Sequence, residues 1–174
     1  MLIRPSKIDD SQHILNLLIN SYSQNRYTKN YAPNWINCFI TNPFIFPSFV
    51  ASDENGIILG YIVWRIRQLS DDHQMTIELQ ELTAQNDPQK PKIERTLFDE
   101  SPKQIINSIT NHGFNIGGKC NLDIWIHHED HINDQSIFSY EQYDQKYGEF
   151  LGIYEKSDAR GGYLSLYRQV YTPK

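Results

Sequence analysis

The sequence is poor in cysteine and in basic residues, and each shortage excludes a class of protein. Only two cysteines occur in 174 residues, Cys38 and Cys120. They are far apart and fit no usual metal-ligand spacing, so we expect reduced, buried thiols in a cytoplasmic protein. Lysine and arginine number 16 against 21 aspartates and glutamates, which gives a net charge of −5. This balance disfavours a general nucleic-acid binder.

Long apolar runs are also missing. No window is apolar enough to suggest a membrane span, and Met1–Asp10 holds no apolar signal core. The chain contains no internal repeat and no linker-like segment. Its length, with 39% hydrophobic and 21% charged residues, predicts one globular domain over residues 1–174.

Hydrophobic periodicity divides the first half of the chain into elements. The predicted elements are a strand (Leu2–Pro5), an amphipathic helix (from about Asp9 to Tyr22), a short helix (Pro33–Ile40) and a hairpin of two strands (Ser48–Ala51 and Ile57–Ile66). The Asn55-Gly56 pair supports the hairpin, because both residues tolerate positive φ. The polar segment Ser23–Pro33 is either a lid over a site or a surface connection.

The stretch Met75–Ala84 is the part of the chain around which the rest is organised. Its apolar residues alternate with polar ones until Leu82, where the break predicts a twist, a bulge or burial on both faces. The following run, Asn86–Lys92, contains Pro88 and Pro91 and predicts a cationic loop that is neither helix nor central strand. We expect a binding site where the strand meets this loop.

The second half of the chain continues the alternation of helices and strands. Ser101, with Pro102 and Gln104 after it, predicts the start of a helix that ends at His112-Gly113. The remaining predicted elements are a strand (Cys120–His127), a helix (Asn133–Tyr147) and two strands (Glu149–Lys156 and Tyr163–Tyr171). The run His127–His131 lacks an established ligand spacing, so we expect a solvated loop and no metal site.

Taken together, these elements resemble the GCN5-related N-acetyltransferase (GNAT) superfamily over essentially the whole chain. The matching residues are the opening Leu2–Pro5 with Asp9-Asp10, the hairpin Asp53–Tyr61, the strand pattern Glu78–Ala84, and Asn133, Ser136 and Tyr140 in the late helix. The resemblance implies an α/β fold with a mixed central sheet of about seven strands flanked by helices. It also implies that the fourth and fifth strands run parallel and splay apart.

The resemblance further implies an acyl-CoA-dependent N-acyltransferase. Acetyl-CoA, or another acyl-CoA, would donate its acyl group to a small-molecule or protein amine that attacks directly. Glu78 matches the position of the general base, and Glu81 is the fallback on the opposite strand face. Tyr140 would protonate the leaving thiolate, with Tyr143 as the runner-up. No nucleic acid or membrane is expected as a partner, and a homodimer stays open.

The cofactor contacts implied by the family are preserved only in part. The backbone of Leu82, Thr83 and Ala84 would pair with the pantetheine amides, and Asn133 lies in the matching late helix. The family's glycine-rich pyrophosphate loop, however, is replaced by Gln89–Glu94, which contains no glycine. One hypothesis is that side-chain cations replace the loop amides, namely Lys90, Lys92, Arg95 and Lys103. The alternative is a degenerate, non-catalytic binding or interaction module.

Overall fold

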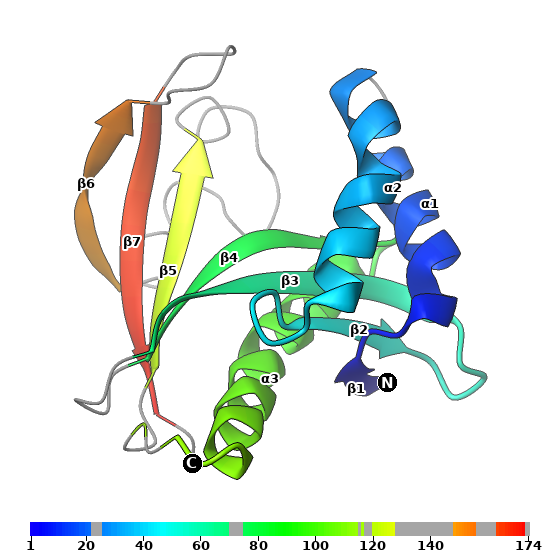
Figure 1. Ribbon diagram of the computed structural model, residues 1–174. Helices are drawn as coiled ribbons and strands as arrows, with labels where there is room; N and C mark the ends of the chain where they lie inside the picture. The colour runs from blue at the N-terminus through cyan, green and yellow to red at the C-terminus, as the bar shows by residue number, and fades with distance from the viewer. Residues whose placement is uncertain are drawn as a thin grey trace.

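The computed structural model describes residues 1–21, 26–69, 75–114, 116, 120–127, 148–155 and 163–172. Within them, seven strands form one mixed sheet in the order β1-β2-β3-β4-β5-β7-β6 (Figure 1). The strands are β1 (Leu2–Pro5), β2 (Ser48–Ser52), β3 (Ile58–Leu69), β4 (Met75–Ala84), β5 (Cys120–His127), β6 (Glu149–Glu155) and β7 (Tyr163–Tyr171). The helical elements are the 3-10 turn η1 (Ile8–Asp10), α1 (Ser11–Ser21), α2 (Arg26–Thr41) and α3 (Lys90–Asn111). The predicted α/β fold with a seven-stranded central sheet is confirmed.

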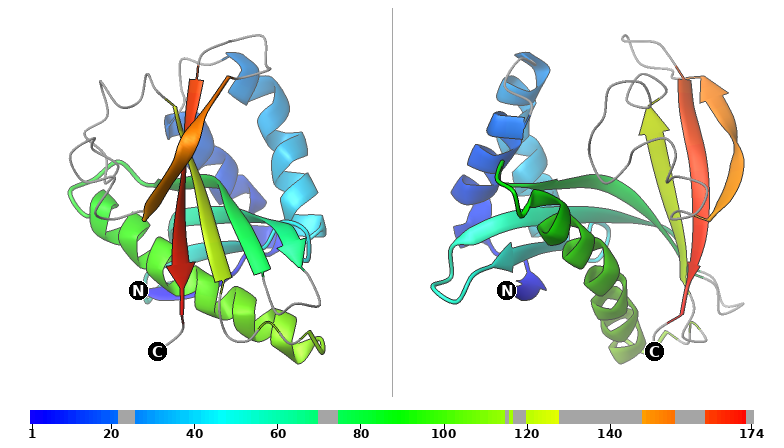
Figure 2. Two further views of the ribbon diagram at one scale, coloured as in Figure 1. Left: turned by 90° about the vertical axis from the view of Figure 1, so that its left-hand side faces the viewer. Right: turned by 180° about the vertical axis from the view of Figure 1, so that it is seen from behind.

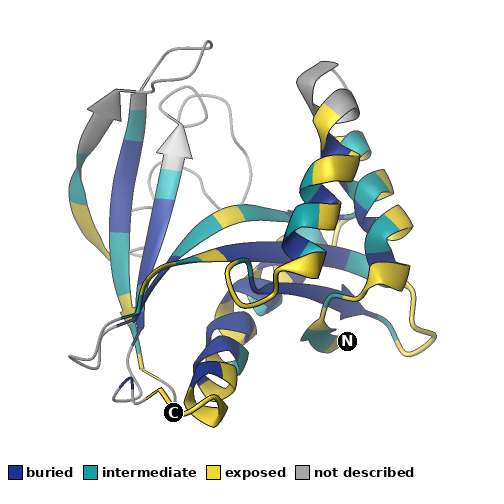
Figure 3. Cartoon of the chain, viewed as in Figure 1, coloured by how far each residue is buried: buried dark blue, intermediate teal, exposed yellow. Residues whose placement is uncertain are grey.

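Helices α1 and α2 cover one face of the sheet, and α3 covers the other (Figures 1 and 2). Strand β3 supplies both cores because its side chains alternate between the faces. Tyr61 and Val63 pack with α1 and α2, whereas Ile62 and Trp64 pack with α3. All four side chains are fully buried, so the centre of the sheet is closed to water on both faces (Figure 3).

The strand pairing follows the predicted order. Strands β2, β3 and β4 form an antiparallel meander, β4 pairs with β5 in parallel, and β7 pairs antiparallel with both β5 and β6. The predicted late helix Asn133–Tyr147 lies outside the described residues, and so do His128–His131. None of the described helices is long and apolar enough to cross a membrane.

Two helix boundaries differ from the sequence prediction. Helix α3 begins at Lys90, so the predictions of a loop through Lys92 and of a helix start at Ser101 are wrong. Pro91 lies in the first helical turn, where a missing N–H is tolerated. Pro102 lies inside the helix and is buried, beside a hydrogen bond from the Trp64 indole to the Ser101 hydroxyl at 2.8 Å. This packing against β3 overrides the local preference for a helix end at a proline.

Helix α2 is likewise longer than predicted. It begins at Arg26 rather than Pro33, and Pro33 lies within it. The irregular stretch expected over Ser23–Pro33, as a lid or as a surface connection, is therefore wrong for residues 26–33, which are helical.

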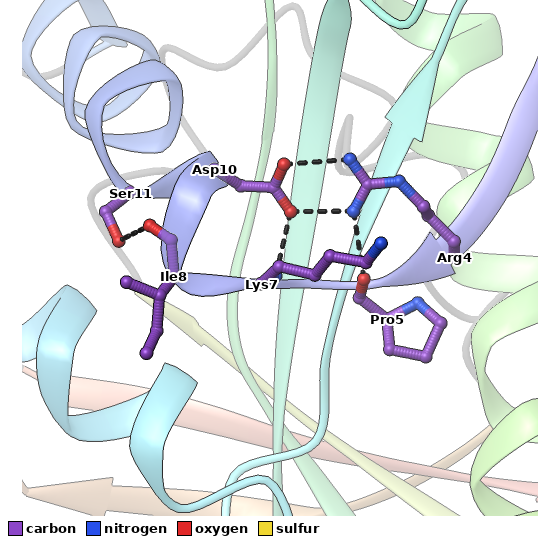
Figure 4. Close-up of polar contacts among 6 residues, drawn as sticks. All are labelled: Arg4, Pro5, Lys7, Ile8, Asp10 and Ser11. Carbon is purple, nitrogen blue, oxygen red and sulfur yellow. Dashed lines mark hydrogen bonds and ion pairs between the residues drawn. The ribbon is translucent and has the colours of Figure 1, made fainter.

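The N-terminal strand is tied to the start of the helical layer by one ion pair (Figure 4). The Arg4 guanidinium donates to both carboxylate oxygens of Asp10 at 2.7 and 2.8 Å, and the Lys7 backbone N–H donates to the same carboxylate at 2.8 Å. Burial raises the pKa of Asp10, but these hydrogen bonds outweigh it and hold that pKa below its ordinary value. The contact fixes the turn that leads from β1 into α1.

Candidate functional site

The parallel strands β4 and β5 separate before either strand ends. Their paired register runs from Met75↔Cys120 to Glu78↔Asp123 and stops there. Strand β4 nevertheless continues to Ala84, and β5 continues to His127 (Figures 1 and 2). The two strands thus run parallel in one sheet and diverge toward their carboxyl ends, as the resemblance predicted. In open α/β sheets, ligands bind at this end of the strands.

Beyond Glu78, part of the β4 backbone faces the divergence and has no strand partner there among the described residues. Gln85 N–H donates to the Leu59 carbonyl at 2.8 Å, which makes these two residues a hydrogen-bonded antiparallel pair. Because such pairs alternate along a ladder, Tyr61 and Thr83 form the next one. The backbone groups of Leu82 and Ala84 therefore point away from β3, toward the side from which β5 has diverged. Of the three predicted backbone ligands, Thr83 is directed to β3 instead.

A bulge in β4 decides which carboxylates lie together. Val63 faces Glu81 and Trp64 faces Leu79, so Gln80 is an extra residue in β4. This confirms the irregularity that the sequence predicted before Leu82. The extra residue shifts the alternation, and Glu78 and Glu81 consequently lie on the same face of the sheet. The expectation that they lie on opposite faces is wrong, because it assumed strict alternation.

Glu81 is held by residues of the helical layer and of β3. The Trp35 indole N–H of α2 donates to Glu81 Oε2 at 3.1 Å. Burial raises the pKa of Glu81 to about 7, while hydrogen bonds from Trp35 and Tyr61 act in the opposite direction and lower it. A carboxylate with a pKa near 7 changes its protonation state in the range where a general base operates.

Glu78 has a different environment from Glu81. Its Oε2 lies 3.3 Å from Arg67 Nη1 in an ion pair, with 12% of the side chain exposed. That oxygen is buried and makes no aligned hydrogen bond among the described residues. Beside it, Asp123 on β5 accepts two hydrogen bonds from Arg168 of β7 at 2.7 and 2.8 Å. Two ion pairs therefore mark the point where β4 and β5 separate.

The four predicted phosphate-binding cations do not form one group. Lys103 lies 13 positions after Lys90 on the continuous helix α3, a separation of about 20 Å. The expectation that Lys103 acts with the other three is therefore wrong, because it placed the helix start at Ser101. Near the helix start, Lys90 lies 3.8 Å from Glu94 and Arg95 donates to Asp99 at 2.7 Å. Lys92 is exposed in the first turn.

The described residues offer neither a reactive thiol at Cys120 nor a metal site. Cys120 is buried, and burial raises the pKa of its thiol to about 12, so it is protonated and unsuited to act as a nucleophile. No cluster of His, Cys, Asp and Glu side chains suited to a metal ion occurs in the described part of the chain. The predicted residues Asn133, Tyr140 and Tyr143 lie outside it.

Sequence reasoning missed the partners of Glu81. Trp35 is 46 positions away, in a helix whose start was misplaced, and Tyr61 belongs to the neighbouring strand. The role of Asp87 at the start of α3 was missed as well. Its signal was present in the sequence, since the aspartate of an Asp-Pro turn before a helix can accept backbone N–H groups two and three residues on.

No family model matches this sequence, and no curated protein matches it either. Solved structures, in contrast, resemble it along its length. An aminoglycoside 6'-acetyltransferase type Ii superposes with a TM-score of 0.69 at 14% identity, covering 100% of this chain and 99% of that one. An aminoglycoside 6'-N-acetyltransferase complexed with coenzyme A gives 0.64 at 14% identity, with 100% and 99% covered.

A third similar structure is a ribosomal-protein-alanine N-acetyltransferase from Brucella melitensis. Its TM-score is 0.56 at 17% identity, with 99% of this chain and 100% of that chain covered. These similarities show that the chain has the fold of the GNAT acetyltransferases, as the order of its elements predicted.

Proposed function

We propose that the protein is an N-acyltransferase that moves an acyl group from an acyl-CoA thioester to an amine. The observation that carries the proposal is the divergence of β4 from β5 beyond Glu78, with the backbone of Leu82 and Ala84 directed toward it and Glu81 beside it. A structure of the same fold complexed with coenzyme A supports the class of donor.

The backbone groups of Leu82 and Ala84, which face the divergence and have no strand partner there among the described residues, would bind the donor. The pantetheine arm of CoA carries two amides, which can pair with β4 as an added strand would. Such pairing needs no particular side chain, so it is compatible with the unusual sequence of this strand. It would place the thioester near the bulge at Gln80.

Glu81 is assigned the role of general base. An amine is mostly protonated at neutral pH, and it must lose a proton before its nitrogen can attack the thioester carbonyl carbon. A C–N bond then forms, the C–S bond breaks, the nitrogen loses its second proton, and the thiolate takes up a proton. Glu81 suits the first step because its pKa is about 7. Tyr140 remains the candidate acid for the last step.

Glu78, the base that the resemblance implied, fits this role less well. Its Oε2 lies 3.3 Å from Arg67 Nη1 in an ion pair, so this oxygen already has a charged partner. We assign Glu78 instead to attraction of the substrate, because it lies on the same face of the sheet as Glu81. Together with Glu81, it places negative charge where a cationic amine would approach.

The proposal is tested by incubating the protein with acetyl-CoA and a panel of primary amines. The expected result is release of free CoA thiol that depends on the amine, with an acetylated product seen by mass spectrometry. Thermal shift with acetyl-CoA provides a readout that does not depend on finding the acceptor. Absence of both amine-dependent thiol release and any thermal shift would favour the non-catalytic binding module.

A further inference from the structure

The connection between β4 and α3 already holds an anion of its own. Five residues, Gln85–Gln89, join the two elements. The Asp87 carboxylate accepts a hydrogen bond from the Gln89 backbone N–H at 2.6 Å, and the Gln85 side-chain amide donates to its other oxygen. The Asp87 carbonyl accepts the Lys90 N–H at 3.0 Å. Asp87 therefore accepts the N–H groups of Gln89, the N-cap residue of α3, and of Lys90, the first helical residue. We call this arrangement the Asp87 cap.

This cap uses most of the groups that would otherwise attract a phosphate. A helix N-terminus binds anions through free backbone N–H groups. Here the Gln89 and Lys90 N–H groups are donated to Asp87, and Pro88 and Pro91 have none. Of the N–H groups in the first turn of α3, that of Lys92 alone has no acceptor among the described residues. The carboxylate adds a negative charge at the same place, and like charges repel.

The nearby cations do not reverse this balance. Lys90 and Arg95 are each within ion-pair distance of a carboxylate on their own helix, Glu94 and Asp99 respectively. Glu94 is only 4% exposed, so the partner of Lys90 is a carboxylate buried near the start of α3. Lys92 remains as an exposed cation beside the Asp87 cap.

We infer that this protein recognises its acyl donor by the pantetheine thioester arm, and that the pyrophosphate of CoA adds little to binding. The inference rests on the proposed function and defines its donor more narrowly. The pantetheine contacts along Leu82 and Ala84 are backbone groups that the Asp87 cap does not use. Of the backbone N–H groups that could hold the pyrophosphate, those of Gln89 and Lys90 are already donated to Asp87.

Calorimetric titration of the wild-type protein with CoA and with pantetheine tests the inference without requiring turnover. The two dissociation constants should agree within about fivefold. A protein that holds the pyrophosphate should differ strongly, since each charge-assisted hydrogen bond is worth roughly 10- to 100-fold in affinity. CoA binding 100-fold tighter than pantetheine binding would overturn the inference and leave the proposed function intact. If neither ligand binds, the proposed function falls, and the inference falls with it.

Two substitutions of Asp87 sharpen the test. Asp87→Asn removes the charge and keeps an oxygen that can accept the Gln89 N–H, and Asp87→Gly also frees that N–H. Both should strengthen CoA binding, by roughly tenfold for Asp87→Asn, because a repelling charge is removed. Pantetheine binding should not change in either variant. Unchanged or weaker CoA binding in Asp87→Asn would contradict the inference.

Glu100→Gln is the matched control. It removes the same charge from an exposed position farther along α3 and leaves the Lys90–Glu94 and Arg95–Asp99 ion pairs in place. Its affinity for CoA should equal that of the wild type. An equal gain in Asp87→Asn and Glu100→Gln would mean that overall charge, and not the cap, governs binding, and would overturn the inference. Melting temperatures of all variants establish that each protein is folded.

Discussion

The indole N–H of Trp35 donates to the Glu81 carboxylate at 3.1 Å and thereby joins helix α2 to the bulged part of β4. Trp35 is itself fixed by edge-on ring contacts with Phe39 and Phe46, at centroid distances of 5.4 and 5.3 Å. The carboxylate is therefore positioned by the helical layer. Its protonation should respond to changes in that layer.

Trp35→Phe should move the pH dependence of acyl transfer. In the wild type, kcat/KM should fall as the pH drops through about 7, because Glu81 becomes protonated and cannot act as a base. The Trp35 hydrogen bond lowers the pKa of Glu81, so its loss should raise that pKa and shift the fall to higher pH by roughly one unit. The pH profiles of both proteins should be measured with the same amine, so that ionisation of the substrate contributes equally to each. Phe44→Leu, which alters a ring that packs against His112 and Phe114, should leave the profile in place.

Glu81→Gln and Glu78→Gln should have unequal effects on turnover. Loss of a general base slows a reaction by roughly 10²- to 10⁴-fold, and we expect this for Glu81→Gln at neutral pH. Part of the rate should return at high pH, where the amine deprotonates unaided. Glu78→Gln should lose less than about tenfold, since we assign it no proton transfer. The reverse ranking in steady-state assays would make Glu78 the base.

Glu81→Gln should also stabilise the protein at alkaline pH. The pKa of Glu81 rises from an ordinary value of 4.5 to about 7 on folding. Between these values the folded state holds a proton that the unfolded state has lost, so the free energy of unfolding falls as pH rises. Glutamine removes this dependence, and urea unfolding at pH 8 should show a gain of roughly 1–3 kcal/mol. The two proteins should converge toward pH 4, and a gain of equal size there would contradict the explanation.

Gly60→Ala should destabilise the fold at the start of β3. An added Cβ would lie 2.9 Å from both the Ala84 Cβ and the Thr83 carbonyl oxygen, and 3.0 Å from Ile93 Cγ2. Two of these atoms belong to the backbone or lie directly on it, so β3 and β4 would have to move apart. Overpacking of this kind costs roughly 1–3 kcal/mol, measurable as a lower urea midpoint.

Gly56→Asn provides the control for that substitution. Gly56 has a φ of +82° and no atom within 4 Å of an added Cβ. Asparagine tolerates this backbone region better than most residues. Its effect on the urea midpoint should be smaller than that of Gly60→Ala, and the opposite order would contradict the close approach at Gly60.

Several features of this protein were determined by the sequence alone. The bounds of β4 and β5, and the order of the described strands and helices, followed from the periodicity of apolar residues. Such periodicity reflects burial of one face, and it is visible within a few neighbouring residues. The hairpin at Asn55-Gly56 and the irregularity before Leu82 were equally local. Their order carried the resemblance to the GNAT superfamily, and that resemblance predicted the fold and the parallel, diverging strands.

Other features were decided only by the tertiary structure. Pro102 and Pro33 are helix-breaking signals, yet both lie inside helices, and in α3 the contact of Trp64 with Ser101 shows why. The bulge at Gln80 brought Glu78 and Glu81 to one face, and Trp35 reached Glu81 from another layer. The physical reason is that burial, pKa and hydrogen bonding depend on groups distant in sequence, whose approach no local pattern records.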